Sequence, residues 1–442
     1  MASSKILPGC LVSLTALVVF YLSWVALPSV GSEDEVKKLL ARQQQAFEED
    51  QKQALDASQN AFIDPQLSPY WGRKSVEHKP HSHAEDVISA LRAFGFLGNQ
   101  SASDSQLSKL WKGKDASLRQ AVADFEALRP TLSGALHRSR FIIPQSERPH
   151  FESEISNYLA QRSIAQALSA YAEVQLANGK PSAALEAALD IFALARLVVS
   201  QRAHPLMITM IGSALQVTAQ ETLSFVLQSH SGWSEAELTS ASRVLDLSAA
   251  DRELGLEAMG YELWVAQNSF ARGPQPAFGT GPLMHAPGVW QREWRLFQND
   301  FYPFLKAARA RQPVSSGWLG QSTFVNWLMG QHSLTSPVLI PNFDRVMSLL
   351  ELARQRQDFL HLYVQLLLQK RRGGLPKELS GQELGKLDPK RLNYRVEKGE
   401  PHLEYVVDPA LATSLPQLKG QRSGASRWEN LMHAHWAIPV AP

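Results

Sequence analysis

The chain has almost no cysteine. Its 442 residues contain one, Cys10, so no internal disulfide can form and stability must come from a buried core. Roughly 410 residues beyond the N-terminus are ample for such a core. An oxidising compartment is compatible with this composition but is not required by it. A lipid-modified cysteine follows an apolar core, whereas Cys10 stands at the start of one; we therefore do not expect lipidation.

The chain also lacks a charge excess of either sign. It has 44 basic and 42 acidic residues, a net charge of +2. Nothing in this balance suggests a large basic surface, and we expect no nucleic-acid partner. One local cluster, Lys370, Arg371 and Arg372, precedes Gly373-Gly374. Cations favour the C-terminal end of a helix and glycine commonly follows it, so we predict a helix terminus there.

Motifs that carry chemistry are missing. No His-Glu-x-x-His occurs. Gly320–Phe324 begins like a nucleophile elbow but has Phe324 where glycine is needed. Gly381–Lys386 is one residue shorter than a phosphate-binding P-loop and is followed by Leu387 instead of serine or threonine. No reaction and no catalytic residue follow from the sequence, which leans against an enzyme.

The N-terminus carries a long apolar run. Residues 9–27 contain no charged side chain, and with residues 6–8 they reach the roughly 20 residues that cross a bilayer. We predict a single transmembrane helix contacting lipid through residues 6–28. A cleaved signal peptide is the alternative, with Ser29-Val30-Gly31 as the cleavage site. Lys5 lies before the run, which predicts a bacterial inner-membrane protein with a periplasmic C-terminal domain.

Helical periodicity dominates the rest of the chain, so the predicted fold class is mainly α. Leu392–Val396 and His402–Val407 alternate as strands do around the turn Glu397–Pro401, which predicts a small C-terminal β-hairpin. The predicted segments are a membrane anchor (1–32), a polar helical stalk with a His-containing loop (33–83), a helical-hairpin domain (84–270), a Gly/Pro-rich and uncharged Trp-containing segment (271–343), a long helix with the β-hairpin (344–413) and a tail (414–442).

The clearest helical unit runs from Ile155 to Val199. Asn178-Gly179-Lys180-Pro181 interrupts it, with glycine suited to a helix C-terminus and proline to the first turn of the next helix. Alanines on both sides permit close approach of the two helices. The unit resembles one tetratricopeptide-type (TPR-like) hairpin; an ordinary hairpin in an irregular bundle is the alternative. In the next predicted helix, we expect Met207 and Met210 to fill the core.

Two further regions are candidates for binding. His78, His81 and His83 have ligand types that suit zinc, with Glu85 and Asp86 nearby; a solvated His-rich turn is the alternative. Residues 312–343 contain no formally charged side chain. Three interpretations of this segment are open: it is part of the buried core, it contacts the lipid interface, or it binds a partner. A pocket lined by Trp318, Phe324 and Trp327 would indicate binding of a lipid or small molecule.

The C-terminal third resembles a group of uncharacterised bacterial envelope proteins. The matching residues are Gly373–Leu379 (Gly-x-x-Pro-x-x-Leu), Asp388-Pro389 and Leu392–Arg395 (Leu-x-Tyr-Arg). Similar turns and strands occur in type II secretion pseudopilins, although the pseudopilin processing site is missing here. The resemblance implies a bacterial envelope protein and transfers no catalytic residue.

Together these features predict a single-pass, membrane-anchored helical scaffold or interaction protein of the bacterial envelope, with another envelope protein as partner. The alternatives are an envelope enzyme with a dispersed active site, with or without a metal, and a lipid- or small-molecule-binding module.

Overall fold

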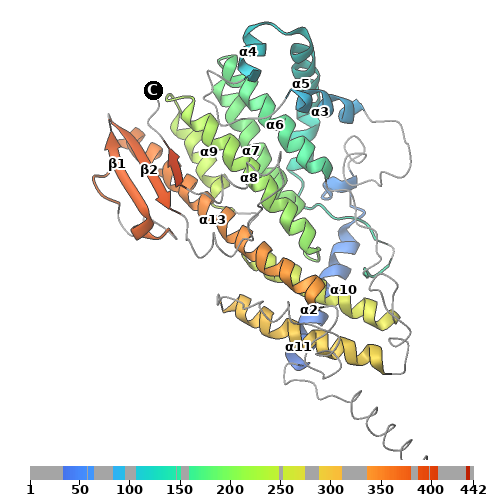
Figure 1. The fold of residues 1–442 in the computed structure, drawn as a ribbon. Helices are drawn as coiled ribbons and strands as arrows, with labels where there is room; N and C mark the ends of the chain where they lie inside the picture. Colours follow the sequence, from blue (N-terminus) through green and yellow to red (C-terminus); the bar gives the residue numbers. More distant parts are fainter. Residues whose placement is uncertain are drawn as a thin grey trace, which may run out of the picture. The chain divides into compact units, whose positions relative to one another are not determined.

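The computed structural model (Figure 1) describes residues 33–56, 58–63, 83–94, 106–145, 147–150, 159–247, 252–273, 288–310, 336–379, 387–397, 399–406 and 435–438. Its α-helices are α2 (Glu33–Gln53), α3 (His83–Ala93), α4 (Gln106–Lys112), α5 (Ala116–Leu136), α6 (Leu159–Ala177), α7 (Pro181–Val198), α8 (Leu206–Gln228), α9 (Glu235–Leu245), α10 (Arg252–Arg272), α11 (Val289–Arg309) and α13 (Ser336–Arg372). The other elements are the 3-10 helices η1 (Ala61–Ile63) and η5 (Pro389–Arg391) and the strands β1 (Leu392–Glu397), β2 (Glu400–Val406) and β3 (His435–Ile438).

The predicted mainly α fold with a small antiparallel hairpin is confirmed. Within the described ranges, no helix combines the length and the apolarity that a bilayer crossing needs. Residues 6–28, for which the sequence predicts a transmembrane helix, lie outside those ranges.

The chain divides into two compact units, each assembled from separate segments. Unit 1 comprises Met1–Phe47, Gln145–Glu154 and Ala258–Asp344, and unit 2 comprises Glu48–Pro144, Ile155–Glu257 and Arg345–Pro442. The segment boundaries expected from the sequence stay predictions.

Aromatic side chains form the core of the described part of unit 1. The ring of Phe270 on α10 lies 4.4 Å from Trp290 and 5.2 Å from Trp294 on α11, measured between centroids. Phe47 on α2 packs against Trp264 on α10 at 5.2 Å. Such pairs bury large apolar areas, and α2, α10 and α11 therefore share one core.

Helices α6, α7 and α8 pack side by side in unit 2. The α6–α7 connection follows the expected chemistry, because Gly179 has φ 71° and Pro181 is the first residue of α7. The helices approach closely through fully buried alanines: Ala165, Ala167, Ala170 and Ala172 on α6, and Ala184, Ala187, Ala188 and Ala195 on α7. The predicted helical hairpin is confirmed.

The unit 2 part of α13 is joined to α8 and α9 by buried glutamines. The Gln220 side chain of α8 donates a hydrogen bond to the Ala353 carbonyl at 2.7 Å. Gln357 of α13 donates to the Leu245 carbonyl, the last residue of α9, at 2.5 Å. Because each amide satisfies a backbone oxygen away from water, these bonds fix how α13 lies against its neighbours.

The three strands form one antiparallel sheet in the order β1-β2-β3. In the β1–β2 hairpin Leu392 is opposite Tyr405, and Gly399 in the turn has φ 78°. The sequence predicts a tail for residues 414–442, but residues 435–438 form β3, with Trp436 opposite Tyr405. A strand of four residues is too short to show a convincing alternating pattern.

The prediction that Met207 and Met210 fill the core is wrong, because they are 39% and 41% exposed. The buried side of α8 instead passes through Thr209, Ser213 and Gln216. Polar side chains therefore occupy positions that a hydropathy pattern would give to the methionines.

Candidate functional site

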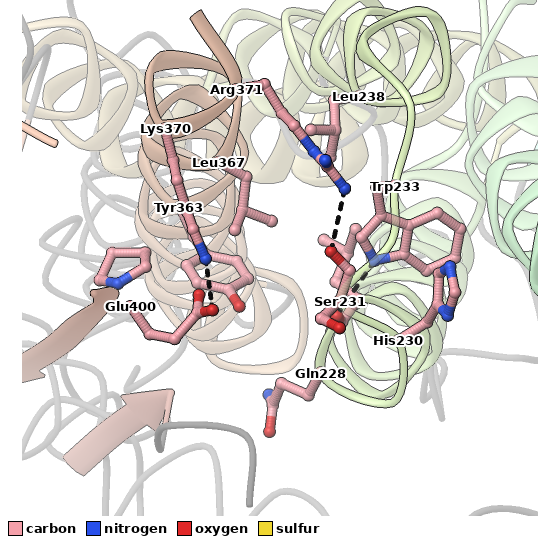
Figure 2. Close-up of a pocket in the computed structure, with 12 residues that line it drawn as sticks. Gln228, His230, Ser231, Trp233, Leu238, Tyr363, Leu367, Lys370, Arg371 and Glu400 are labelled. Carbon is pink, nitrogen blue, oxygen red and sulfur yellow. Dashed lines mark hydrogen bonds and ion pairs between the residues drawn. The ribbon is translucent and has the colours of Figure 1, made fainter. Parts of the chain in front are cut away.

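A pocket opens in unit 2 at the C-terminal ends of α8 and α13, beside the first residues of β2 (Figure 2). Its cavity volume of about 350 Å³ lies at the lower end of the range for small-ligand sites. The lining residues are Leu227, Gln228, His230, Ser231, Trp233, Leu238, Tyr363, Leu367, Lys370, Arg371, Glu400 and Pro401.

The short loop between α8 and α9 forms one wall of the pocket. The indole N–H of Trp233 donates to the Leu227 carbonyl at 3.2 Å, near the end of α8. The His230 ring stands edge-on to Trp233, with centroids 4.9 Å apart. The next helix begins with a capping box, in which Ser234 and Glu237 satisfy each other's backbone N–H groups. Helix ends on both sides therefore hold the loop in place.

The opposite wall is the last turn of α13. This helix ends at Arg372, and the N–H groups of Gly373 and Gly374 both donate to the Gln369 carbonyl at 3.2 Å. Gly373 has φ 151° and Gly374 has φ 137°, in the region that glycine tolerates best. The predicted helix terminus is confirmed, and it positions Lys370 and Arg371 at the pocket.

Three consecutive cations at this terminus have three different partners. Lys370 forms an ion pair with Glu400 of β2. Arg371 donates to the backbone carbonyl of Ser231 at 3.1 Å. Arg372 pairs with Glu235 at 2.6 Å and does not line the pocket. The lining thus carries two cations and one carboxylate, and among the described residues only a neutral oxygen accepts from Arg371.

Tyr363 brings a buried polar group to the same cavity. Its side chain comes from α13, two turns before the cations, and is 7% exposed. Figure 2 shows its hydroxyl beside the Glu400 carboxylate. Burial, helped by the negative charge of Glu400, raises the pKa of Tyr363 to about 12. A phenol is already protonated at neutral pH, and this shift moves its ionisation further away, so the hydroxyl is able to donate a hydrogen bond to a ligand.

The predicted metal ligands fall mostly outside the described part of the chain. His78 and His81 lie there, while His83 is the first residue of α3 and is exposed. Within the described ranges, no three His, Cys, Asp or Glu side chains are grouped as a metal site would need. The zinc assignment stays a prediction. Trp318, Phe324 and Trp327 also lie outside the described residues.

One cluster in unit 2 has the residue types of a catalytic triad without its geometry. The Ser242 hydroxyl lies 3.0 Å from His361 Nε2, and the Asp246 carboxylate lies 3.4 Å from the same nitrogen. In a triad the acid bonds the nitrogen opposite the serine. Gln365 donates to Ser242 at 2.7 Å. These contacts join α9 to α13. They do not hold the imidazole in the orientation in which it could take a proton from the serine hydroxyl.

Sequence reasoning found the cations of the pocket but missed its other walls. Lys370 and Arg371 were recognisable as a charge cluster. Tyr363 belongs to a helical stripe, Trp233 belongs to a loop and Glu400 is the first residue of β2, and nothing in their local spacing marks them as neighbours. They meet only because α13 returns to the end of α8.

Comparison of the chain with models of known protein families, with curated proteins and with solved structures finds no match.

Proposed function

We propose that this chain is a helical interaction protein of the bacterial envelope, tethered to the inner membrane by residues 6–28 with its body in the periplasm. The apolar run supports the tether, since it has the length of a bilayer span and no charge. The observation that carries the interaction role is the pocket of unit 2, where apolar side chains lie beside two cations and a buried phenol.

The α6–α7 hairpin supports the same role. Its alanine-rich contact and its Gly179–Pro181 turn are features of helical-hairpin repeats, and we propose that it is a TPR-like unit in an otherwise irregular bundle. Helical layers of this kind present grooves that accept helices or extended peptides. An envelope protein is the partner that fits the proposed location.

Site-specific photo-crosslinking in cells tests the docking role. A photo-reactive amino acid at Ser231, which lines the pocket, should form an adduct with one envelope protein. The same group at Glu186, an exposed residue of α7 outside the lining, is the control and should not. Combining the Ser231 probe with Arg371→Glu should abolish the adduct, because the substitution reverses a charge at the pocket. An adduct that forms equally at both positions contradicts a pocket-directed interaction.

Protease treatment of intact spheroplasts tests the tether and the topology. A periplasmic body is degraded from outside, whereas protection of the C-terminal part would contradict the proposed orientation. A mature chain that starts near Ser32 and is released without detergent would contradict the tether itself.

A small-molecule-binding module is the second candidate function. The observation that favours it is the cavity volume of about 350 Å³, which suits a compact ligand as well as the side chain of a protein partner.

A further inference from the structure

The charges on the pocket lining leave an excess of one positive charge. Lys370 is neutralised by Glu400, with which it forms an ion pair. No carboxylate of a described residue pairs with Arg371, which donates a hydrogen bond to the Ser231 carbonyl at 3.1 Å. A guanidinium has five N–H donors, so one bond to a backbone oxygen leaves most of them available. The pocket is therefore suited to a ligand with a single negative charge.

The Tyr363 hydroxyl supplies a second, independent indication of a ligand. The side chain is 93% buried, since 7% of its surface is exposed, and its hydroxyl faces the cavity (Figure 2). No residue in the described ranges forms a hydrogen bond with this hydroxyl. A hydroxyl that reaches a cavity without a protein acceptor is free to donate a hydrogen bond to a ligand oxygen there.

Apolar side chains complete the cavity. Leu227 and Leu238 are 2% and 1% exposed, and Leu367 of α13 also lines the pocket. Trp233 is fixed beside them by its bond to the Leu227 carbonyl. These groups offer no partner for a polar ligand atom except the indole N–H, which is already used. The part of a ligand that contacts them is apolar.

We propose that the pocket binds one carboxylate group attached to an apolar body, with Arg371 and Tyr363 donating to the carboxylate and Leu227, Leu238 and Leu367 contacting the body. The inference rests on the proposed docking role of the pocket and names the chemistry that the pocket recognises. The source of the carboxylate is a free small acid or the C-terminus of a peptide, since both present the same group.

A carboxylate fits better than a phosphate for two electrostatic reasons. Glu400 lines the same cavity, and a dianion would be repelled by it more strongly than a monoanion. The C-terminal ends of α8 and α13 also lie at the pocket, and helix C-termini carry a partial negative charge. One guanidinium compensates a single negative charge but not two.

Calorimetric titration of the purified full-length chain tests the proposal. The probes are N-acetyl-leucine, its uncharged amide, a tripeptide ending in leucine with a free carboxylate, its C-terminal amide, and inorganic phosphate. At least one of the two acids should bind saturably with a dissociation constant of about 1 mM or below, and its amide and phosphate should bind at least about tenfold more weakly. A tripeptide acid that binds at least about tenfold tighter than N-acetyl-leucine identifies a peptide C-terminus; comparable binding identifies a free acid.

Variants assign the contacts. Arg371→Gln should weaken binding of the acid by about tenfold or more, because it removes the positive charge, and Tyr363→Phe should weaken it severalfold, because it removes the hydroxyl donor. Arg372→Gln is the matched control: it removes the neighbouring cation, which pairs with Glu235 outside the lining, and should leave the affinity unchanged. Glu400→Gln should tighten binding, since it removes the competing anion. A gain of affinity cannot result from a misfolded variant.

The proposal is overturned if neither acid saturates the chain, if the amides or phosphate bind as well as the acids, or if Arg372→Gln weakens binding as much as Arg371→Gln. If one of these results is obtained but the crosslink from Ser231 persists, only the carboxylate assignment is overturned and the docking role stands. Loss of the crosslink together with intact acid binding would overturn the docking role and favour a small-molecule module.

Discussion

Gly212 shows how one residue sets the approach of two helices. A Cβ atom at this position of α8 would lie 2.4 Å from Val199 Cγ1 at the end of α7, closer than real carbon contacts allow. Gly212→Ala should lower the free energy of unfolding by about 1–3 kcal/mol, the typical cost of overpacking a core. Chemical denaturation of the wild type and of Gly212→Ala measures this difference in the free energy of unfolding.

The control for Gly212→Ala is Gly134→Ala on α5. No atom lies within 4 Å of a Cβ built there, and alanine favours a helix over glycine by up to about 1 kcal/mol. This variant should be neutral or more stable than the wild type. Equal destabilisation by both substitutions would show that contact with Val199 is not the cause.

His204 makes stability depend on pH. It is fully buried, with Nδ1 2.6 Å from the Gln201 carbonyl and Nε2 3.0 Å from the Thr209 hydroxyl. Desolvation lowers its pKa from 6.5 to about 4. Between these values the unfolded chain binds a proton that the folded chain does not, so stability falls as the pH drops from 6.5 to about 4. The loss for this group totals about 3 kcal/mol.

The His204→Gln variant isolates that contribution. Carboxylates that titrate in the same pH range affect both proteins. The informative quantity is therefore the difference in the free energy of unfolding between wild type and variant. Denaturant unfolding at several pH values should show this difference narrowing from pH 6.5 to about 4, because glutamine takes up no proton. Parallel curves would contradict the assignment to His204.

At the scale of one element, the capping box of α9 is testable. Ser234 accepts from the Glu237 N–H at 3.2 Å and the Glu237 side chain accepts from the Ser234 N–H at 2.8 Å. Ser234→Ala should cost about 1 kcal/mol of unfolding free energy. Ser240→Ala, an exposed position on the same helix, should change it by less than about 0.5 kcal/mol. A urea titration compares the two, and equal effects would exclude capping as the cause.

Elements whose local chemistry agrees with the final structure were predictable. The α6–α7 turn has glycine and proline where helix ends need them, and Gly399 stands in the turn between two alternating strands. The predictions from sequence were wrong where tertiary contacts determine the burial of a side chain or the formation of a strand. Met207 and Met210 are exposed because polar residues of α8 face the interior, and β3 exists only because β2 offers it an edge.

The candidate site was predictable only in part, for the same reason. The cations of α13 follow from helix-end chemistry, which is local. Tyr363 reaches the cavity because the end of α13 lies beside the end of α8, and Glu400 reaches it because the chain returns after Gly374. The periodicity of a single sequence reports local structure and not contacts between distant segments, so only the three-dimensional structure shows the pocket.

At the scale of the whole molecule, the division into two compact units leads us to expect that each unit can be destabilised without an equal effect on the other. Phe297 on α11 and Phe192 on α7 are both 1% exposed, one in each unit. Replacing either with alanine should cost about 3–5 kcal/mol. In hydrogen–deuterium exchange, Phe297→Ala should reduce the protection of α11 amides more than that of α7 amides, and Phe192→Ala should do the reverse. Equal loss of protection in both helices would show that the units unfold together.

The pocket draws its walls from residues 227–238, 363–371 and 400–401, and this spread governs when the site exists. As the chain leaves the ribosome, the first wall emerges long before the last. A product that stops after Arg372 would keep both helical walls but lack Glu400, so the Lys370 ammonium would lose its counter-ion. Chains that end before Glu400 therefore present a more cationic opening, and the full set of pocket charges is assembled only after residues 400–401 have been made.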